Sequence, residues 1–293
     1  MLGLFTSLIT SSKIFCFMGD IRLWVHDIDD CWAAFKKPSP PNTQAMNDYL
    51  DDLLGLRQFL DEVVRPQGAV SGACTNRSLH LTKDLSARVG LQGPVIVEGG
   101  LQMWGPMTGV VTALAAKIRP EHKELYQRFE EWIFEEAPGI HHHIVKKFGD
   151  DVILMDNFSM YTLEFNSRED PETIFRYLAV EGYLPEEFYQ GMQKGLFTLS
   201  TVDFAFDFKP SISKGDGVRY ALDKIGVSRG EVLGTGNSSH SDKAMMDACA
   251  FVGCPANADD QLQAYVRERG GFVSSKPYME GILEVGEHFF GSG

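Results

Sequence analysis

A short apolar run, residues 21–26, ends in two carboxylates that stand two residues apart, Asp27 and Asp29. An apolar run of this length is typical of a buried strand. In an open α/β sheet, the chemistry lies at the carboxyl ends of the strands. Buried carboxylates without partners cost too much free energy to serve as packing residues. The segment therefore indicates a site for a metal ion or a carboxylate nucleophile, and we expect phosphate chemistry there.

Strand-like and helix-like segments alternate along most of the chain, which predicts a mostly parallel sheet covered by helices. Residues 101–206 break this alternation and are typical of an α+β insertion. Single strands are expected at 21–26, 68–74, 94–97, 152–155, 160–165, 231–234 and 251–254, and more than one strand around 198–207. The expected helices are 42–64, 79–89, 120–137, 171–181, 214–225, 241–250 and 258–269.

Residues 1–17 are apolar but too short to cross a bilayer, and they lack the basic region of a secretory signal. We interpret them as an N-terminal tail or as the product of an overlong start, with Met18 as the second plausible start. The alternative is a weak membrane or organelle-targeting role.

Charge and cysteine content exclude several classes of function. The net charge is −13 and no long basic run is present, which argues against a nucleic-acid partner. The five cysteines form no C-x-x-C pair, which argues against a disulfide framework and a cysteine zinc site. We therefore expect a cytoplasmic protein, monomeric or homodimeric, with no membrane partner.

Four separated motifs together supply the groups that phosphoryl transfer needs. They are Asp27-Ile28-Asp29, Thr75-Asn76-Arg77, Lys214-Gly215 and residues 234–242. One carboxylate can attack phosphorus, and a second can protonate the leaving oxygen. A hydroxyl and a lysine can hold the phosphate oxygens, and oxygen ligands near Asp242 can complete a Mg²⁺ shell.

Each motif taken singly also has a simpler interpretation. Thr75-Asn76-Arg77 is a common polar turn, and Lys214 on its own fits a solvated first helical turn. Asp242 follows a serine before an expected helix and fits an N-cap. The four motifs in this order favour the catalytic interpretation.

This ordered set resembles the haloacid dehalogenase (HAD) superfamily of aspartyl-phosphate phosphatases. The resemblance covers about residues 20–290. It is strongest with the subgroup that inserts an α/β cap between the second and third motifs and that includes archaeal phosphoglycolate phosphatases and sugar-phosphate phosphatases. Two further segments resemble that subgroup, Glu98-Gly99-Gly100 and Cys254-Pro255-Ala256-Asn257-Ala258. The resemblance implies a Rossmann-like core of residues 18–100 and 207–293 and a cap domain of residues 101–206.

The resemblance also implies roles for individual residues. Asp27 would be the nucleophile and a metal ligand, and Asp29 the general acid and base whose carbonyl touches the metal. Lys214 would neutralise Asp27 and the phosphoryl group. Thr75, with Asn76 beside it, would bind that group, and Asp242 would help to hold Mg²⁺.

The fourth motif departs from the family pattern Gly-Asp-x-x-x-Asp. Thr235 stands where the family has its first aspartate, and the segment up to Asp242 is longer by two or three residues. Either Asn237 or Ser238 could supply a neutral oxygen, or Asp242 could bind the metal directly. Cys31 is a second departure, because the family usually has threonine or valine there.

We therefore predict a Mg²⁺-dependent phosphomonoesterase, a hydrolase that acts on a small phosphorylated sugar or organic acid of the phosphoglycolate kind. The alternative is a catalytically weakened or inactive protein of the same fold that binds a phosphorylated ligand. A phosphotransferase or mutase built on the same aspartyl phosphate is also compatible with the motifs.

Overall fold

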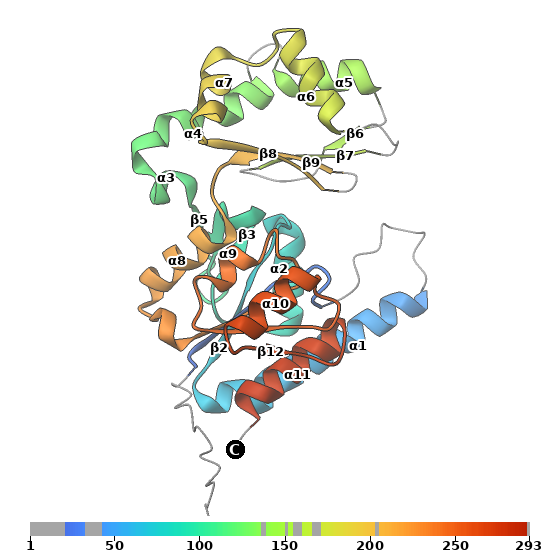
Figure 1. Cartoon of the computed structure of the whole chain (residues 1–293), viewed down its shortest axis with the longest axis vertical. Helices are drawn as coiled ribbons and strands as arrows, with labels where there is room; N and C mark the ends of the chain where they lie inside the picture. The colour runs from blue at the N-terminus through green and yellow to red at the C-terminus, as the bar shows by residue number, and fades with distance from the viewer. Residues whose placement is uncertain are drawn as a thin grey trace, which may run out of the picture.

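The chain folds around two separate β-sheets (Figure 1). The computed structural model describes residues 21–32, 43–135, 139–149, 152–154, 160–165, 171–202 and 205–291. Residues 1–17 and Met18, on which the predicted start depends, lie outside the described residues. None of the described helices is both long and apolar enough to cross a bilayer.

The larger sheet has eight strands, and six of them run parallel to one another. Two antiparallel strands extend it at one edge. Its order is β12 (Phe272–Val273), β11 (Phe251–Cys254), β10 (Val232–Thr235), β1 (Leu23–His26), β2 (Val70–Cys74), β3 (Val95–Val97), β4 (Gln102–Trp104) and β5 (Val111–Ala113). The predicted α/β fold with a parallel core sheet is confirmed.

The strand register brings three of the four sequence motifs together. His26, the last residue of β1, is paired with Thr235 on one side and with Ala73 on the other. Because all three strands are parallel, the loops that follow them leave the sheet at the same edge. Asp27, Thr75 and the segment after Thr235 are therefore neighbours in space.

Helices cover both faces of the larger sheet. On one face, Trp24 packs against Phe59 of α1 (Thr43–Phe59) and Phe290 of α11 (Tyr278–Phe290). The adjacent strand residues Leu23 and Val25 point to the opposite face, where they meet Val218 of α8 (Lys214–Ile225). This two-residue alternation fixes which side of β1 each helix layer occupies.

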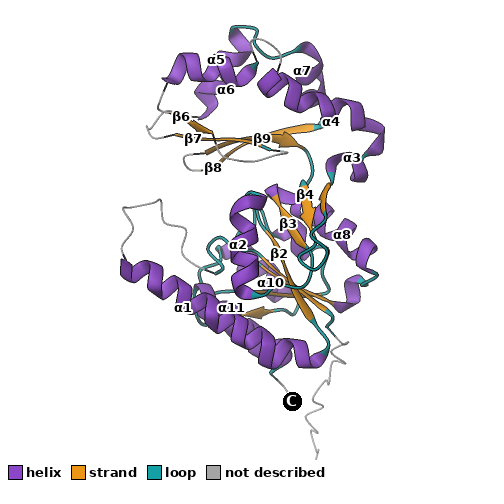
Figure 2. Cartoon of the chain, turned by 180° about the vertical axis from the view of Figure 1, so that it is seen from behind, coloured by secondary structure: helices purple, strands orange, loops and turns teal. Residues whose placement is uncertain are grey.

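The smaller sheet is antiparallel, with the order β6 (Val152–Leu154), β7 (Tyr161–Phe165), β9 (Ala205–Pro210) and β8 (Phe197–Val202). Four helices cover the face that points away from the larger sheet (Figures 1 and 2). They are α4 (Lys123–Glu130), α5 (Ile140–Phe148), α6 (Pro171–Val180) and α7 (Glu186–Gln193). The interior between them includes a cluster of aromatic rings from Phe129, Trp132, Phe188, Phe197 and Phe208.

The structure differs from the predicted elements in a few places. A helix is present within the predicted range 241–250, but the predicted length is wrong, because α9 spans only Lys243–Met246. The chain tightens there, since the Cys249 N–H donates to the Met246 carbonyl, and it must then enter β11. The helices α3 (Ala115–Ile118), α5, α7 and α11 and the strands β4, β5 and β12 had not been predicted. The domain boundaries at residues 100 and 206 stay a prediction, but β4 and β5 between them pair with the larger sheet.

Candidate active site

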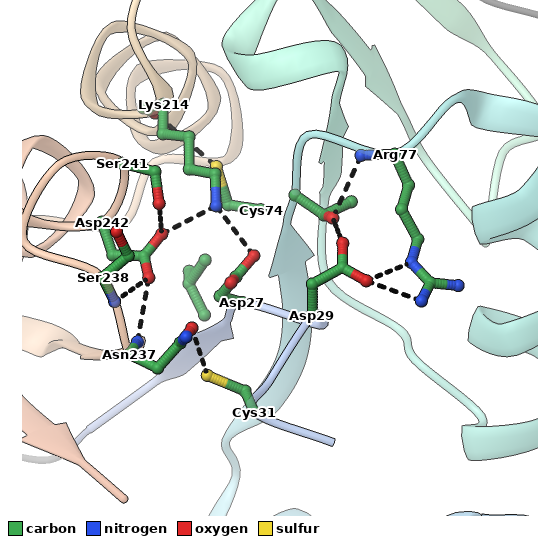
Figure 3. Close-up of polar contacts among 12 residues, drawn as sticks. Asp27, Asp29, Cys31, Cys74, Arg77, Lys214, Asn237, Ser238, Ser241 and Asp242 are labelled. Atoms are coloured by element: carbon green, nitrogen blue, oxygen red, sulfur yellow. Dashed lines mark hydrogen bonds and ion pairs between the residues drawn. The ribbon is translucent and has the colours of Figure 1, made fainter. Parts of the chain in front are cut away.

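Four segments that are far apart in the sequence meet at the carboxyl edge of the larger sheet (Figure 3). Asp27 directly follows β1 and is 4% exposed, and its N–H donates to the carbonyl of Thr235 (2.8 Å). Thr75 follows β2 and is fully buried. Lys214 reaches the same place from the start of α8, and Asp242 from the loop after β10.

Helix α8 is built so that Lys214 points at the strand ends. Ser213 and Asp216 form a capping box, in which each side chain accepts a hydrogen bond from the other's backbone N–H (3.2 and 2.9 Å). Gly215 lets the helix approach α9, because a Cβ atom there would lie 2.1 Å from the carbonyl oxygen of Ala244. The sequence pair Lys-Gly therefore has a structural reason as well as a chemical one.

The Lys214 ammonium is shared by two carboxylates. Its Nζ donates to Asp27 Oδ1 (2.8 Å) and to Asp242 Oδ1 (2.7 Å), and all three side chains are buried. Burial opposes the charge on Lys214, but Asp242 and Asp27 outweigh it and raise the pKa of the amine well above its ordinary value. Burial and the nearby Asp242 raise the pKa of Asp27 to about 8, although Lys214 opposes the rise. The cluster has an excess of negative charge only when Asp27 is ionised, because one ammonium then faces two carboxylates, and a bound cation would favour that state.

Asp242 has both of its oxygens engaged by protein donors. Oδ1 accepts from Lys214 and from Ser241 Oγ (2.9 Å). Oδ2 accepts from the backbone N–H groups of Asn237 (2.9 Å) and Ser238 (3.0 Å). Gly236 makes room for this carboxylate, since a Cβ atom there would lie 2.6 Å from Oδ2. Asp242 therefore fixes the loop and the lysine together.

Asp29 points away from Lys214, toward the loop after β2 (Figure 3). Its Oδ1 accepts from Arg77 Nε (2.8 Å) and lies 2.6 Å from a terminal guanidinium nitrogen of Arg77. Thr75 Oγ1 donates to its Oδ2 (3.4 Å) and accepts from the Arg77 N–H (3.2 Å). The Asp29 side chain is 27% exposed, so solvent and small molecules can reach it. Asn76, in the same loop, is exposed.

The side chains of the fourth motif, residues 234–242, point in different directions. Thr235 Oγ1 accepts from Trp24 Nε1 (3.2 Å), so its side chain turns to the interior of the sheet and not to Asp27. The Asn237 side chain lies beside Asp27, and Ser238 contributes its backbone N–H to Asp242. Lengthening of this loop thus brings an amide to the place beside Asp27.

The planar amide of Asn237 fits its place in either of two orientations, which differ in which atom, oxygen or nitrogen, faces Asp27. In one, its oxygen accepts from the Cys31 thiol (3.4 Å). In the other, its nitrogen donates to Asp27 Oδ2 (3.2 Å) and to the carbonyl oxygen of Asp29 (3.0 Å). A 180° rotation of the planar amide exchanges the two atoms.

Two cysteines border the cluster without taking part as thiolates. Burial raises the pKa of the Cys31 thiol well above its usual range, and Asp27 and Asp242 add to the effect. Burial likewise raises the pKa of Cys74, whose Sγ lies 3.8 Å from the carbonyl oxygen of Lys214. Both therefore stay protonated and are poor nucleophiles.

The structure brings together Asp27, Asp29, Thr75, Lys214, Asn237 and Asp242, as the sequence predicts. The prediction assigned no role to Arg77 or Ser241, although both are fixed directly to these residues. Arg77 follows Thr75 by two residues, and its place in the motif was the available signal. Ser241 gave no signal beyond its position next to Asp242.

Comparison with known proteins supports this architecture. No family model matches the sequence. A phosphoglycolate phosphatase of Thermoplasma volcanium is 40% identical over 76 residues, which is 26% of this chain and 32% of that protein. The chain thus spans about a third of the length of that relative. A phosphoglycolate phosphatase of Staphylothermus marinus is 22% identical over 223 residues, or 75% of this chain and 82% of that protein.

Solved structures share the fold over nearly the whole chain. The sucrose-phosphatase of Synechocystis, solved with sucrose and phosphate, has a TM-score of 0.56 at 15% identity, covering 92% of this chain and 98% of that one. A haloacid dehalogenase-like hydrolase from Bacteroides thetaiotaomicron has a TM-score of 0.55 at 13% identity, covering 92% and 99%. The TM-scores show a shared fold, and at such low sequence identities they show the fold alone.

Proposed function

We propose that the chain is a member of the haloacid dehalogenase (HAD) superfamily and a Mg²⁺-dependent phosphomonoesterase that acts through an aspartyl-phosphate intermediate. Its substrate is a small phosphorylated sugar or organic acid, of the phosphoglycolate kind. The observation that carries the proposal is the Lys214 ammonium held between Asp27 and Asp242, with Asp29 two residues beyond Asp27.

Each step of the proposed reaction has a residue in place. An Asp27 carboxylate oxygen forms a bond to phosphorus while the ester P–O bond breaks. Asp29 donates a proton to the leaving oxygen and then takes one from the water that attacks phosphorus. Inorganic phosphate leaves and Asp27 is restored. Lys214 stabilises the negative charge on the phosphoryl oxygens, and Thr75 and Arg77 hold Asp29 in place.

The residues fit a hard divalent cation. Asp27 Oδ2 and the Asp29 carbonyl oxygen both lie within 3.2 Å of the same position, that of the nearer amide atom of Asn237. All these donors are oxygens of the type that Mg²⁺ prefers, and with Asp27 ionised the cluster has two carboxylates for one ammonium. Asp27 and the Asp29 carbonyl would hold the ion. When bound, Mg²⁺ supplies the positive charge that keeps Asp27 ionised and offsets the charge of the phosphoryl group.

A second function is favoured by one feature of the fourth motif. Thr235 points into the sheet, so the first aspartate of the family pattern has no counterpart at position 235. A protein with a weakened cation site would bind a phosphorylated ligand without turnover. Calorimetry with phosphate esters separates the two, because this function predicts binding that is nearly independent of Mg²⁺ and releases no phosphate.

The test is phosphate release from a panel of monoesters by the full chain, with and without Mg²⁺. The panel includes 2-phosphoglycolate, hexose phosphates, sucrose 6-phosphate and p-nitrophenyl phosphate. We expect Mg²⁺-stimulated release from at least one ester, and a loss of about 10³-fold or more in the isosteric variant Asp27→Asn. Acid-quenched enzyme reduced with borohydride should carry homoserine at position 27, the product of an acyl phosphate. Full activity of Asp27→Asn, or no release from any ester, overturns the proposal.

A further inference from the structure

We propose that the third protein ligand of this cation site is the side-chain oxygen of Asn237, not Asp242, and that the Cys31 thiol positions it. The inference rests on the proposed metal-dependent function and deepens it. If Asn237 is the ligand, the fourth motif supplies a neutral group, and the affinity for the cation depends on that.

Asp242 is already committed to other partners. Its two oxygens accept from the Lys214 ammonium, the Ser241 hydroxyl and two backbone N–H groups, at 2.7 to 3.0 Å. Binding a cation directly would require the carboxylate to give up some of these buried hydrogen bonds, which costs free energy for each donor left without an acceptor. Asp242 therefore acts by shaping the loop that presents Asn237.

Asn237 stands where a third ligand is needed. One position of its amide is 3.2 Å from Asp27 Oδ2 and 3.0 Å from the Asp29 carbonyl oxygen. Oxygens that share an octahedral Mg²⁺ at about 2.1 Å are about 3.0 Å apart when adjacent. With oxygen in that position, three oxygens have the spacing of neighbouring ligands. With nitrogen in that position, the amide donates to both acceptors. The same side chain can therefore serve the site with a bound cation and the site without one.

Without a cation, the nitrogen-inward orientation satisfies Asp27 Oδ2 and the Asp29 carbonyl. The neighbouring thiol offers a donor to the oxygen-inward orientation, which a bound cation would require. Cys31 Sγ lies 3.4 Å from Asn237 Oδ1 and can donate its S–H to it. An amide oxygen has two lone pairs, so it can accept from the thiol and still face a cation. Cys31 is thus a positioning residue, in the manner of groups that orient metal ligands from behind.

The site has few charged ligands by this assignment. Among the described residues, no three His, Cys, Asp or Glu side chains are grouped to hold a metal ion. The oxygens placed beside Asp27 are instead those of an amide and a main-chain carbonyl. Affinity for divalent cations rises with the number of charged ligands, so a carboxylate at position 237 should bind the ion more tightly.

The experiment is a titration of the full chain with Mn²⁺, in which free Mn²⁺ is counted by electron paramagnetic resonance. We expect Asn237→Asp to lower the Kd for Mn²⁺ by about tenfold or more, and Asn237→Leu to raise it by about tenfold or more. Cys31→Ala should raise the Kd severalfold, and Cys31→Ser, which keeps a donor, should restore it. Thermal unfolding of each variant without metal confirms that it is folded.

The outcomes separate this inference from the proposed function. If Asp27→Asn abolishes Mn²⁺ binding while Asn237→Asp and Asn237→Leu both bind like the wild type, the assignment of Asn237 is wrong and the metal-dependent function stands. Wild-type Kd values in Cys31→Ala would overturn the role of the thiol. If neither the wild type nor Asn237→Asp binds Mn²⁺, the inference is overturned, and phosphate release then decides the fate of the proposed function.

Discussion

The two sheets of this molecule differ in the side chains that are buried beside them. At the carboxyl edge of the larger sheet, Asp27, Lys214 and Asp242 are buried ionisable side chains joined by short hydrogen bonds. In the smaller sheet and its helices, the interior is dominated by aromatic side chains, such as Phe188, whose ring centroid lies 4.3 Å from that of Phe208.

The difference follows from how each sheet is built. Parallel strands end together, so their loops can gather charged groups from distant parts of the sequence and satisfy them mutually. The antiparallel sheet buries one face under helices and needs only apolar contact there. Chemistry therefore belongs to the first region and packing to the second, and the two should respond differently to substitution.

Lys214→Met should have the largest effect, because it leaves two buried carboxylates without their shared cation. We expect a loss of about 3–5 kcal/mol in the free energy of unfolding, together with loss of phosphatase activity. Urea unfolding and phosphate release measure the two effects. The double variant Lys214→Met with Asp242→Asn should regain part of the stability and none of the activity. A stable, active Lys214→Met would remove the basis of the comparison.

Phe188→Ala tests the packing region. Phe188 is fully buried among aromatic rings, so its truncation should cost about 3–5 kcal/mol of stability through lost contacts and a cavity. Mn²⁺ affinity should stay within about twofold of the wild type at temperatures where the variant is folded. Phe188→Leu is the matched control and should lose less stability. A loss of Mn²⁺ binding as large as that of Asp27→Asn would mean that the two regions are not separable in this way.

His26 makes the stability of the charged region depend on pH. It is fully buried, its Nε2 lies 2.7 Å from Ser71 Oγ, and burial lowers its pKa to about 3. Below pH 6.5 His26 is protonated in the unfolded chain but stays neutral in the folded chain. Stability is therefore complete above pH 6.5 and falls toward pH 3, by about 1.4 kcal/mol per pH unit from this group.

The check is urea unfolding of wild type and His26→Gln at pH 7.5 and 5.5. The stability difference between the two proteins should shift by about 1 kcal/mol in favour of the variant at the lower pH. A difference that does not change with pH would show that His26 is protonated in the folded state as readily as in the unfolded one.

Ser213→Ala should have the smallest effect. It removes one half of the capping box at the start of α8, at a cost of about 1 kcal/mol in stability. Because Lys214 is the next residue, we also expect a small fall in kcat, measured by steady-state phosphate release. Ser228→Ala is the control and should leave kcat unchanged, because Ser228 caps the short helical turn Arg229–Glu231 beyond the opposite end of α8 from Lys214.

Much of the active site could be predicted from the sequence because its parts lie next to the strands that position them. Asp27 and Thr75 directly follow apolar strands, Gly234 lies in one, and Lys214 begins a helix with a clear cap. The shortness of helix α9 was not predictable from the sequence. It arises because the Asp242 side chain binds the backbone N–H groups of the preceding loop and the chain enters β11 soon after the helix. Strands β4 and β5 are too short to give a pattern.

The sequence by itself determined that a strand ends in Asp27 and Asp29, and that a lysine and further oxygens follow in the order that phosphoryl transfer needs. Only the tertiary structure decided which oxygens of the long fourth loop face Asp27. Position in the chain does not say where a side chain points. Here Thr235 turns inward because Trp24 needs an acceptor, Asp242 turns to Lys214, and the amide of Asn237 takes the place beside Asp27.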